Sequence, residues 1–136
     1  MNSLIEAYKN TKYIVFEPTL IIEIGKLNLE IDDIIINHNS NSWAFITAYN
    51  PFSRILTNDE NRLRHDELKE LTKDYITFEG HGVGENPTWE PELSLLIIGI
   101  SKDDASKIGK EFEQNAIVYG LINETPQLLI LNQELN

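Results

Sequence analysis

Residues 43–49 are apolar at almost every position, and this run constrains the fold more than any other feature of the chain. A strand with one face in water alternates apolar and polar side chains, whereas a strand covered on both faces does not. Residues 93–100 form a second run of this kind. We therefore predict that both runs are interior strands of one sheet.

Shorter signals place the other elements. Two capping boxes mark helix starts, one formed by Thr57 with Glu60 and one by Ser101 with Asp104. The first of these helices is predicted to run to about residue 73. Apolar residues at helical spacing predict two more helices, one over residues 2–9 and one that begins at residue 27 or 28. Further strands are predicted over residues 13–16, 20–24, 75–79, 116–119 and 127–131.

The order of these elements favours an α+β fold. Short turns join neighbouring strands, which favours antiparallel pairing, and the strict alternation of a doubly wound parallel fold is missing. We predict a two-layer domain with a mixed or largely antiparallel sheet covered by about three helices. A chain of 136 residues is expected to form a single globular domain over residues 1–136.

Composition and charge exclude several classes of function. The chain has no cysteine, which removes disulfides, thiolate metal sites and a cysteine nucleophile. The net charge of −11 argues against duplex nucleic acid and anionic membranes as partners, and it leaves a basic protein partner open. The longest apolar run is too short to cross a bilayer, and residues 1–6 lack the apolar run of a signal peptide. We expect a cytoplasmic protein.

Several short segments are together similar to a known family. They are Ala7-Tyr8, the run over residues 43–51, Asn58-x-x-Asn61, Glu79-Gly80-His81-Gly82, Trp89-x-x-Glu92-x-Ser94 and Phe112-x-Gln114-Asn115-Ala116. From about residue 4 to residue 131 the chain resembles the bacterial domain-of-unknown-function family 3293. The resemblance implies a small soluble domain with one recurring polar pattern and no established activity. This pattern includes Asn50, Asn61, Glu92, Gln114 and Asn115.

The first group of candidate site residues lies where the strand over 43–49 ends and the next helix begins. It comprises Thr47, Asn50, Ser53, Asn58 and Asn61, and Asn58 can alternatively cap the helix. Asparagine amides both donate and accept hydrogen bonds and so suit the polar edge of a small ligand. An alternative is local structure, because Asn before Pro forms turns and Ser53 can bond nearby backbone. Asn61 is harder to explain this way, since asparagine is a poor residue inside a helix.

The second group lies in a segment at residues 80–92 that we expect to be a flexible, glycine-rich loop. His81, flanked by glycines, and Glu92 are the candidate catalytic residues, because both side chains can transfer protons. Glu92 also precedes a buried strand, where a charge needs a partner. The spacing of His81 with nearby glutamates matches no strong metal signature, so no metal site is predicted. His65 is expected on an exposed helix face.

Four further residues are candidates for ligand binding, and each has a structural alternative. Arg64 can bind an anion or pair with acids on its helix. Trp89 can form a lid over a pocket or cover the sheet edge. Gln114 and Asn115 can contact a ligand or end a helix, with Asn115 in the left-handed conformation of a C-cap.

These groups together predict a pocket for a small polar, nucleotide-like ligand between the turn at residues 50–53 and the loop at residues 80–92. One alternative is a hydrolase or nucleotide-modifying enzyme that uses His81 and Glu92. A second alternative is an acidic protein-interaction module without a pocket. No motif identifies a cofactor or an oligomeric state.

Overall fold

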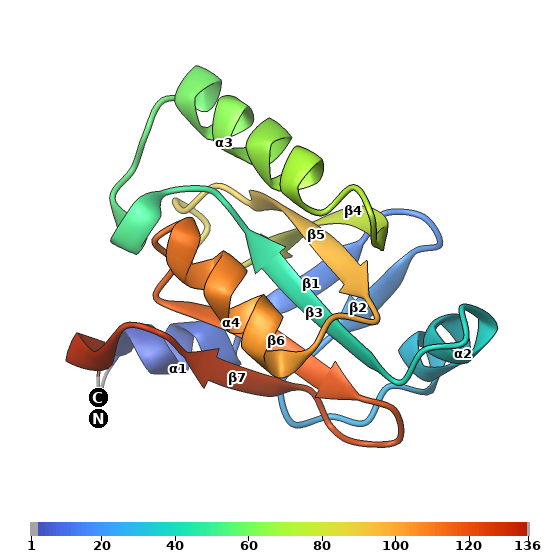
Figure 1. Cartoon of the computed structure of the whole chain (residues 1–136). Helices are drawn as coiled ribbons and strands as arrows, with labels where there is room; N and C mark the ends of the chain where they lie inside the picture. The colour runs from blue at the N-terminus through green and yellow to red at the C-terminus, as the bar shows by residue number, and fades with distance from the viewer. Residues whose placement is uncertain (1–2, 136) are drawn as a thin grey trace.

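The computed structural model describes residues 3–135 and contains a seven-stranded sheet in the order β2-β1-β4-β5-β3-β6-β7. Every neighbouring pair of strands in this sheet is antiparallel (Figure 1). The predicted interior runs are β3 and β5, which pair with each other near the middle of the sheet. The strands are β1 (Lys12–Val15), β2 (Leu20–Ile22), β3 (Ser42–Thr47), β4 (Ile76–Val83), β5 (Glu92–Ile98), β6 (Ala116–Leu121) and β7 (Gln127–Ile130).

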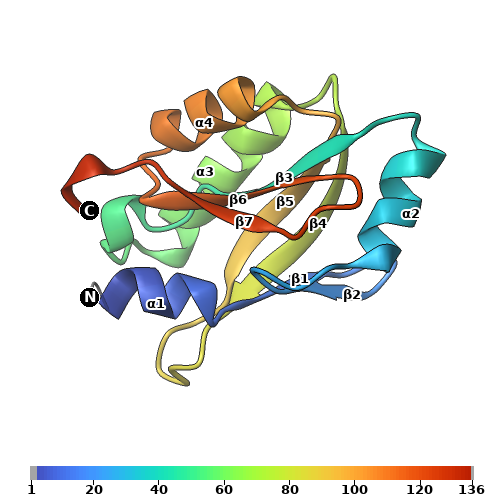
Figure 2. The same cartoon turned by 90° about the horizontal axis from the view of Figure 1, so that it is seen from below.

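Helices cover both faces of the sheet. Helices α3 and α4 lie on one face, and α1 and α2 lie on the other, where the β1–β2 hairpin curls beneath β6 and β7 (Figure 2). The helices are α1 (Ser3–Lys9), α2 (Leu29–Asn37), α3 (Asn58–Leu71) and α4 (Lys102–Glu111), with short 3-10 turns η1 (Pro51–Ser53) and η2 (Gln133–Leu135). The expected start of the first helix at residue 2 lies outside the described residues.

The α+β class and the antiparallel sheet agree with the sequence prediction, whereas the number of layers differs. Side chains of β3 alternate between two separate cores: Phe45 packs in the core that includes Ile35 of α2, and Ile46 packs with Leu68 of α3 and Ala105 of α4. A strand that is apolar on both faces needs cover on both faces. The four α-helices of the described residues therefore form two outer layers, where we expected about three helices in one.

Side-chain caps set the helix starts where the sequence predicts them. The Thr57 hydroxyl accepts the N–H of Glu60 at 3.1 Å, and the Glu60 carboxylate accepts the N–H of Thr57 at 3.1 Å. The Ser101 hydroxyl accepts the N–H of Asp104 at 3.1 Å. Asn28 caps α2 in the same way. Each cap satisfies a backbone donor that has no partner within its helix.

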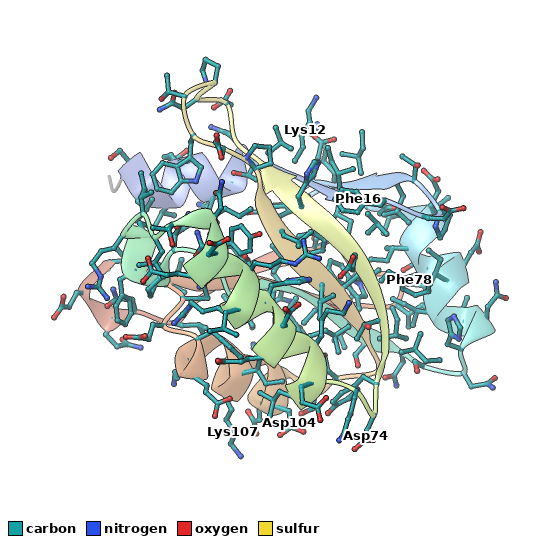
Figure 3. All side chains as sticks on the ribbon, turned by 90° about the horizontal axis from the view of Figure 1, so that it is seen from above. Lys12, Phe16, Asp74, Phe78, Asp104 and Lys107 are labelled. Carbon is teal, nitrogen blue, oxygen red and sulfur yellow. The ribbon has the colours of Figure 1, made fainter. Side chains whose placement is uncertain are left out.

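The helices are short and have one apolar side. In α4, Ala105 is buried against the sheet, while Asp104 and Lys107 are exposed and project away from it (Figure 3). The charged residues of α4 thus form a solvent-facing surface.

Within residues 3–135 no helix has the length and the apolar character that a membrane span requires.

Candidate functional site

A cavity of about 490 Å³ opens on the face of the sheet that carries α1. Its walls come from α1, the turn after β3, the connection between β4 and β5, and the inner side of the sheet. Apolar side chains from three strands contribute part of the lining, namely Phe45, Val118 and Leu128. The volume lies in the range of pockets that hold small molecules. A cavity therefore lies between the turn at residues 50–53 and the 80–92 segment.

Glu92 places a carboxylate in the wall of this cavity. It is the first residue of β5, and its partner on β4 is Gly82, which has no side chain to fill the adjoining space. Oε2 of Glu92 accepts hydrogen bonds from the Asn50 amide at 2.8 Å and from the Trp89 indole at 3.3 Å. Burial raises the pKa of Glu92, and these two hydrogen bonds offset only part of that effect.

Asn61 holds Asn50 in position for this contact. The side-chain carbonyl of Asn61 accepts the backbone N–H of Asn50 at 2.9 Å, and its amide donates to the side-chain carbonyl of Asn50 at 2.8 Å. Asn61 is 4% exposed although it lies in the second turn of α3. This pairing explains why a poor helix former occupies the position: its amide connects α3 to the turn.

The turn itself has an unusual backbone. Asn50, Phe52 and Ser53 have φ values of 48°, 49° and 63°, all in the left-handed region that non-glycine residues rarely adopt. The N–H of Phe52 donates to the carbonyl of Glu113 at 2.7 Å, which ties the turn to the end of α4. Contacts from two helices therefore hold a strained turn, and strain of this kind clusters at functional sites.

Asn115 and Gln114 connect the turn to other walls of the cavity. The Asn115 amide donates to the Ser53 hydroxyl at 3.0 Å and to the Tyr8 hydroxyl of α1 at 3.2 Å. The Gln114 amide donates to the carbonyl of Tyr49 at 2.9 Å. The left-handed residue after α4 is Glu113, with φ of 58°, so the alternative that Asn115 adopts this conformation is wrong. Asn115 instead organises the site.

Arg64 and Thr47 are bound to protein backbone. The Arg64 guanidinium donates to the carbonyls of Ala48 and Phe112, and it lies outside the cavity lining. Its role is therefore to join β3, α3 and α4. Thr47 lines the cavity, and its hydroxyl donates to the carbonyl of Leu93 at 2.7 Å.

His81 does not reach the cavity. It pairs with Leu93, one residue along from the pair of Gly82 and Glu92, so His81 and Glu92 lie on opposite faces of the sheet. The ring of His81 instead packs edge-on against Phe16, with 4.8 Å between ring centroids. The expectation that His81 shares one cleft with the other candidate residues is wrong.

The segment expected to be a flexible loop is partly strand, because β4 extends to Val83. A Cβ atom on Gly80 would lie 2.2 Å from the carbonyl oxygen of Ile14 in β1. Gly80 thus permits the close approach of β4 and β1, which is one known use of glycine within a sheet. Only residues 84–91 remain as a connection between strands, and Trp89 from this connection lines the cavity.

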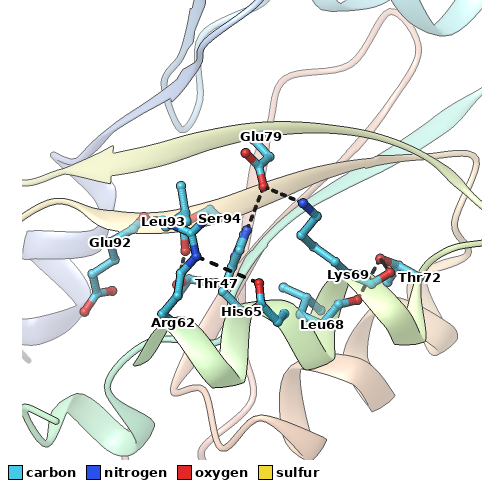
Figure 4. A network of polar contacts seen from close by, with 11 residues as sticks. Thr47, Arg62, His65, Leu68, Lys69, Thr72, Glu79, Glu92, Leu93 and Ser94 are labelled. Atoms are coloured by element: carbon cyan, nitrogen blue, oxygen red, sulfur yellow. Dashed lines mark hydrogen bonds and ion pairs between the residues drawn. The ribbon is translucent and has the colours of Figure 1, made fainter. Parts of the chain in front are cut away.

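A separate polar group lies on the opposite face of the sheet. His65 is fully buried, against the expectation that it is exposed, and its Nε2 lies 3.1 Å from the Glu79 carboxylate. Lys69 reaches the same carboxylate at 3.2 Å, and Figure 4 shows Glu79 between the two, with Glu92 set apart. The hydrogen bond from His65 lowers the pKa of Glu79. Leu68, which follows the same helical face, is also buried, so this group connects α3 to β4 through the core.

Sequence reasoning missed the contribution of α1 and of two strand residues. Glu6 and Tyr8 of α1 line the cavity together with Tyr13 and Ser94. Tyr8 lies within the Ala7-Tyr8 pair that supports the family resemblance, and this pair was the available signal. One chain of hydrogen bonds connects Asn50, Asn61 and Glu92, and of these three residues Asn50 and Glu92 line the cavity, whereas Asn61 does not.

This chain is an α+β protein with a cavity beside a strained turn. A family model described as "Protein of unknown function (DUF3293)" matches residues 46–117, more than half of the chain. The chain belongs to this family, as its sequence pattern indicates. No curated protein and no solved structure matches it.

Proposed function

We propose that the protein binds a small ligand with a polar head and an apolar body, with Glu92 as the polar anchor. The observation that carries this proposal is the coincidence of a mostly enclosed carboxylate with a cavity of about 490 Å³. A buried carboxylate without a counter-charge lowers stability. A binding site is a common reason to keep such a group.

The hydrogen bonds around Glu92 support binding rather than a purely structural role. Both donors, the Asn50 amide and the Trp89 indole, are neutral and reach the same oxygen, Oε2. Within residues 3–135 no hydrogen bond reaches Oε1. The second oxygen is therefore available to a ligand, while the first is held by the protein.

The alternative functions have less support. A hydrolase that uses His81 together with Glu92 requires both side chains on one face, and they lie on opposite faces. Among the described residues no group of three potential ligands is placed to hold a metal ion. An acidic interaction module needs no cavity, whereas this chain has one lined by residues from α1, β3, β5 and β6.

The test uses two substitutions on one edge strand. Leu128 lines the cavity, and Leu129, its neighbour on β7, packs in the core on the opposite face. Leu128→Trp fills the cavity, and Leu129→Trp is the matched control because it adds the same ring elsewhere. A thermal-shift screen against small amines, alcohols, acids, nucleosides and nucleotides is expected to yield compounds that stabilise the natural protein and the control only. A screen without such compounds, or equal stabilisation of Leu128→Trp, would contradict the proposal.

A further inference from the structure

Charge in the cavity narrows the class of ligand. The lining includes three carboxylates, from Glu6, Glu85 and Glu92, and among the described residues it includes no lysine, arginine or histidine. Arg64, the arginine predicted to bind an anion, is occupied by two backbone carbonyls and pairs with Glu113. Phosphate and carboxylate groups need a cation or a set of free N–H donors. An anionic head group, including the phosphate of a nucleotide, is therefore a poor fit for this cavity.

The polar side chains of the lining independently favour a ligand that is not an anion. The Thr47 hydroxyl donates to the carbonyl of Leu93, and the Ser94 hydroxyl donates to the carbonyl of Glu92. Burial raises the pKa of Tyr13, so its hydroxyl keeps its proton, which it donates to the carbonyl of Tyr8. These protons are already used, and the oxygens can only accept further hydrogen bonds.

Gln114 and Glu92 extend this pattern. The Gln114 amide nitrogen donates to the carbonyls of Tyr49 and Phe112, which leaves its side-chain oxygen as an acceptor. Oε1 of Glu92 is likewise an acceptor without a partner among the described residues. The amides of Asn10 and Asn86 also line the cavity, but both side chains are exposed. Donors that remain in the lining are one hydroxyl proton of the Tyr8–Ser53 pair and the second N–H of the Asn50 amide. The enclosed part of the cavity thus offers mostly acceptors and favours a ligand that donates.

Aromatic side chains complete the environment. Tyr8, Tyr13, Phe45 and Trp89 all contribute to the lining. The faces of aromatic rings attract cations, and their area covers an apolar body. A cation with N–H donors can pair with the acceptor oxygens and the carboxylates of the lining, and its apolar body can pack against the aromatic rings.

We infer that the ligand is an organic ammonium ion, a primary or secondary amine on an apolar or aromatic body, whose N–H group donates to Oε1 of Glu92. This inference deepens the proposed function and rests on it, because it assumes that the cavity is a binding site. The ligand's charge selects against nucleotides, and its N–H donors select against quaternary ammonium ions.

The experiment titrates labelled protein with matched probes and follows backbone amide signals by NMR. Phenethylamine carries charge and donors, its N,N,N-trimethyl derivative carries charge alone, phenethyl alcohol is neutral, and 3-phenylpropionate is anionic. Butylamine and tryptamine vary the body, and adenosine with its 5′-monophosphate tests the nucleotide alternative. We expect at least one primary amine to bind about tenfold or more tightly than the alcohol, because hydrogen bonds to a charged group are the stronger ones.

Two variants locate the interaction. Glu92→Gln is expected to weaken amine binding about tenfold or more while it leaves the affinity for phenethyl alcohol within about twofold. Glu90→Gln removes the same charge two residues away, from an exposed side chain outside the cavity lining, and is expected to change neither affinity. Shifts around Leu128 and their loss in Leu128→Trp place the probe in the cavity.

The remaining outcomes contradict either the ammonium inference alone or the proposed function as well. Binding of the alcohol, the acid or the monophosphate at least as tight as that of any amine, blocked by Leu128→Trp, would overturn the ammonium inference and leave the proposed function intact. Amine binding that is insensitive to Glu92→Gln would do the same. Absence of binding by every probe, or binding that Leu128→Trp does not block, would overturn both.

Discussion

Glu92→Gln is expected to make the unliganded protein more stable at neutral pH. The carboxylate is largely buried, and its raised pKa shows that the cost of burial exceeds the gain from its two hydrogen bonds. A glutamine side-chain oxygen can accept the same bonds from Asn50 and Trp89 that now reach Oε2. The substitution therefore removes the charge and keeps the contacts.

The expected gain is about 1 kcal/mol, the usual scale of the effect of a single substitution. For a domain of this size that gain raises the melting temperature by roughly 3–5 °C. Urea unfolding of both proteins at several pH values from about 4 to 8 measures it directly.

The pH dependence has a defined sign. The pKa of Glu92 in the folded protein lies above its ordinary value of 4.5. Ionisation of Glu92 therefore lowers stability as pH rises from that value through the folded pKa, and the glutamine variant lacks this contribution. The difference between the two proteins is small near pH 4, grows through this window and is constant above it.

Glu90→Gln, at an exposed side chain, is the control and is expected to change stability by less than about 0.5 kcal/mol. A glutamine variant at position 92 that is less stable than the natural protein at pH 7 would refute the argument. An advantage that is equally large at pH 4 and pH 7 would show that packing, and not charge, is responsible.

Three further predictions concern the framework of the site. Asn61→Ala removes both hydrogen bonds to Asn50 and leaves buried polar groups unsatisfied, so urea unfolding is expected to show a loss of about 2 kcal/mol; an unchanged midpoint would contradict its role. Thr57→Ala and Ser101→Ala each remove a helix cap and are expected to cost about 1 kcal/mol each in the same assay, whereas a loss in neither would mean that the caps are unimportant. Amide hydrogen exchange is expected to be slowest in β3 and β5, which lie between other strands and are covered on both faces, and faster exchange there than in the edge strand β7 would contradict this.

The features that local sequence signals determine could be predicted. The capping residues Thr57 and Ser101 mark helix starts because their side chains bond backbone atoms only three residues away. The interior position of β3 follows from its apolar residues on both faces. Asn50, Asn61 and Glu92 were grouped correctly because each polar side chain stands at the end or start of an element without a sufficient local partner.

The features that depend on distant contacts could not be predicted. The spacing of Gly80 and Gly82 is equally compatible with a flexible loop and with close strands, and the deciding neighbour, Ile14, lies far away in the sequence. His81 was misplaced for this reason. The burial of His65 likewise depends on Glu79 of β4, which the pattern of α3 alone does not reveal. The role of Tyr8 depends on Asn115, 107 residues away.

Helix α1 gives the cavity a wall with little stability of its own. It has seven residues, none of them buried, and its link to the rest of the site includes the bond between Tyr8 and Asn115. A helix this short is marginal in water without such contacts, and segments with few buried residues open most often by local unfolding. Transient detachment of α1 would widen the entrance without disturbing the sheet. For the ligand proposed above, the rates of entry and exit would then depend on the fraying of this helix, whereas its affinity would depend on the contact with Glu92 on the other side.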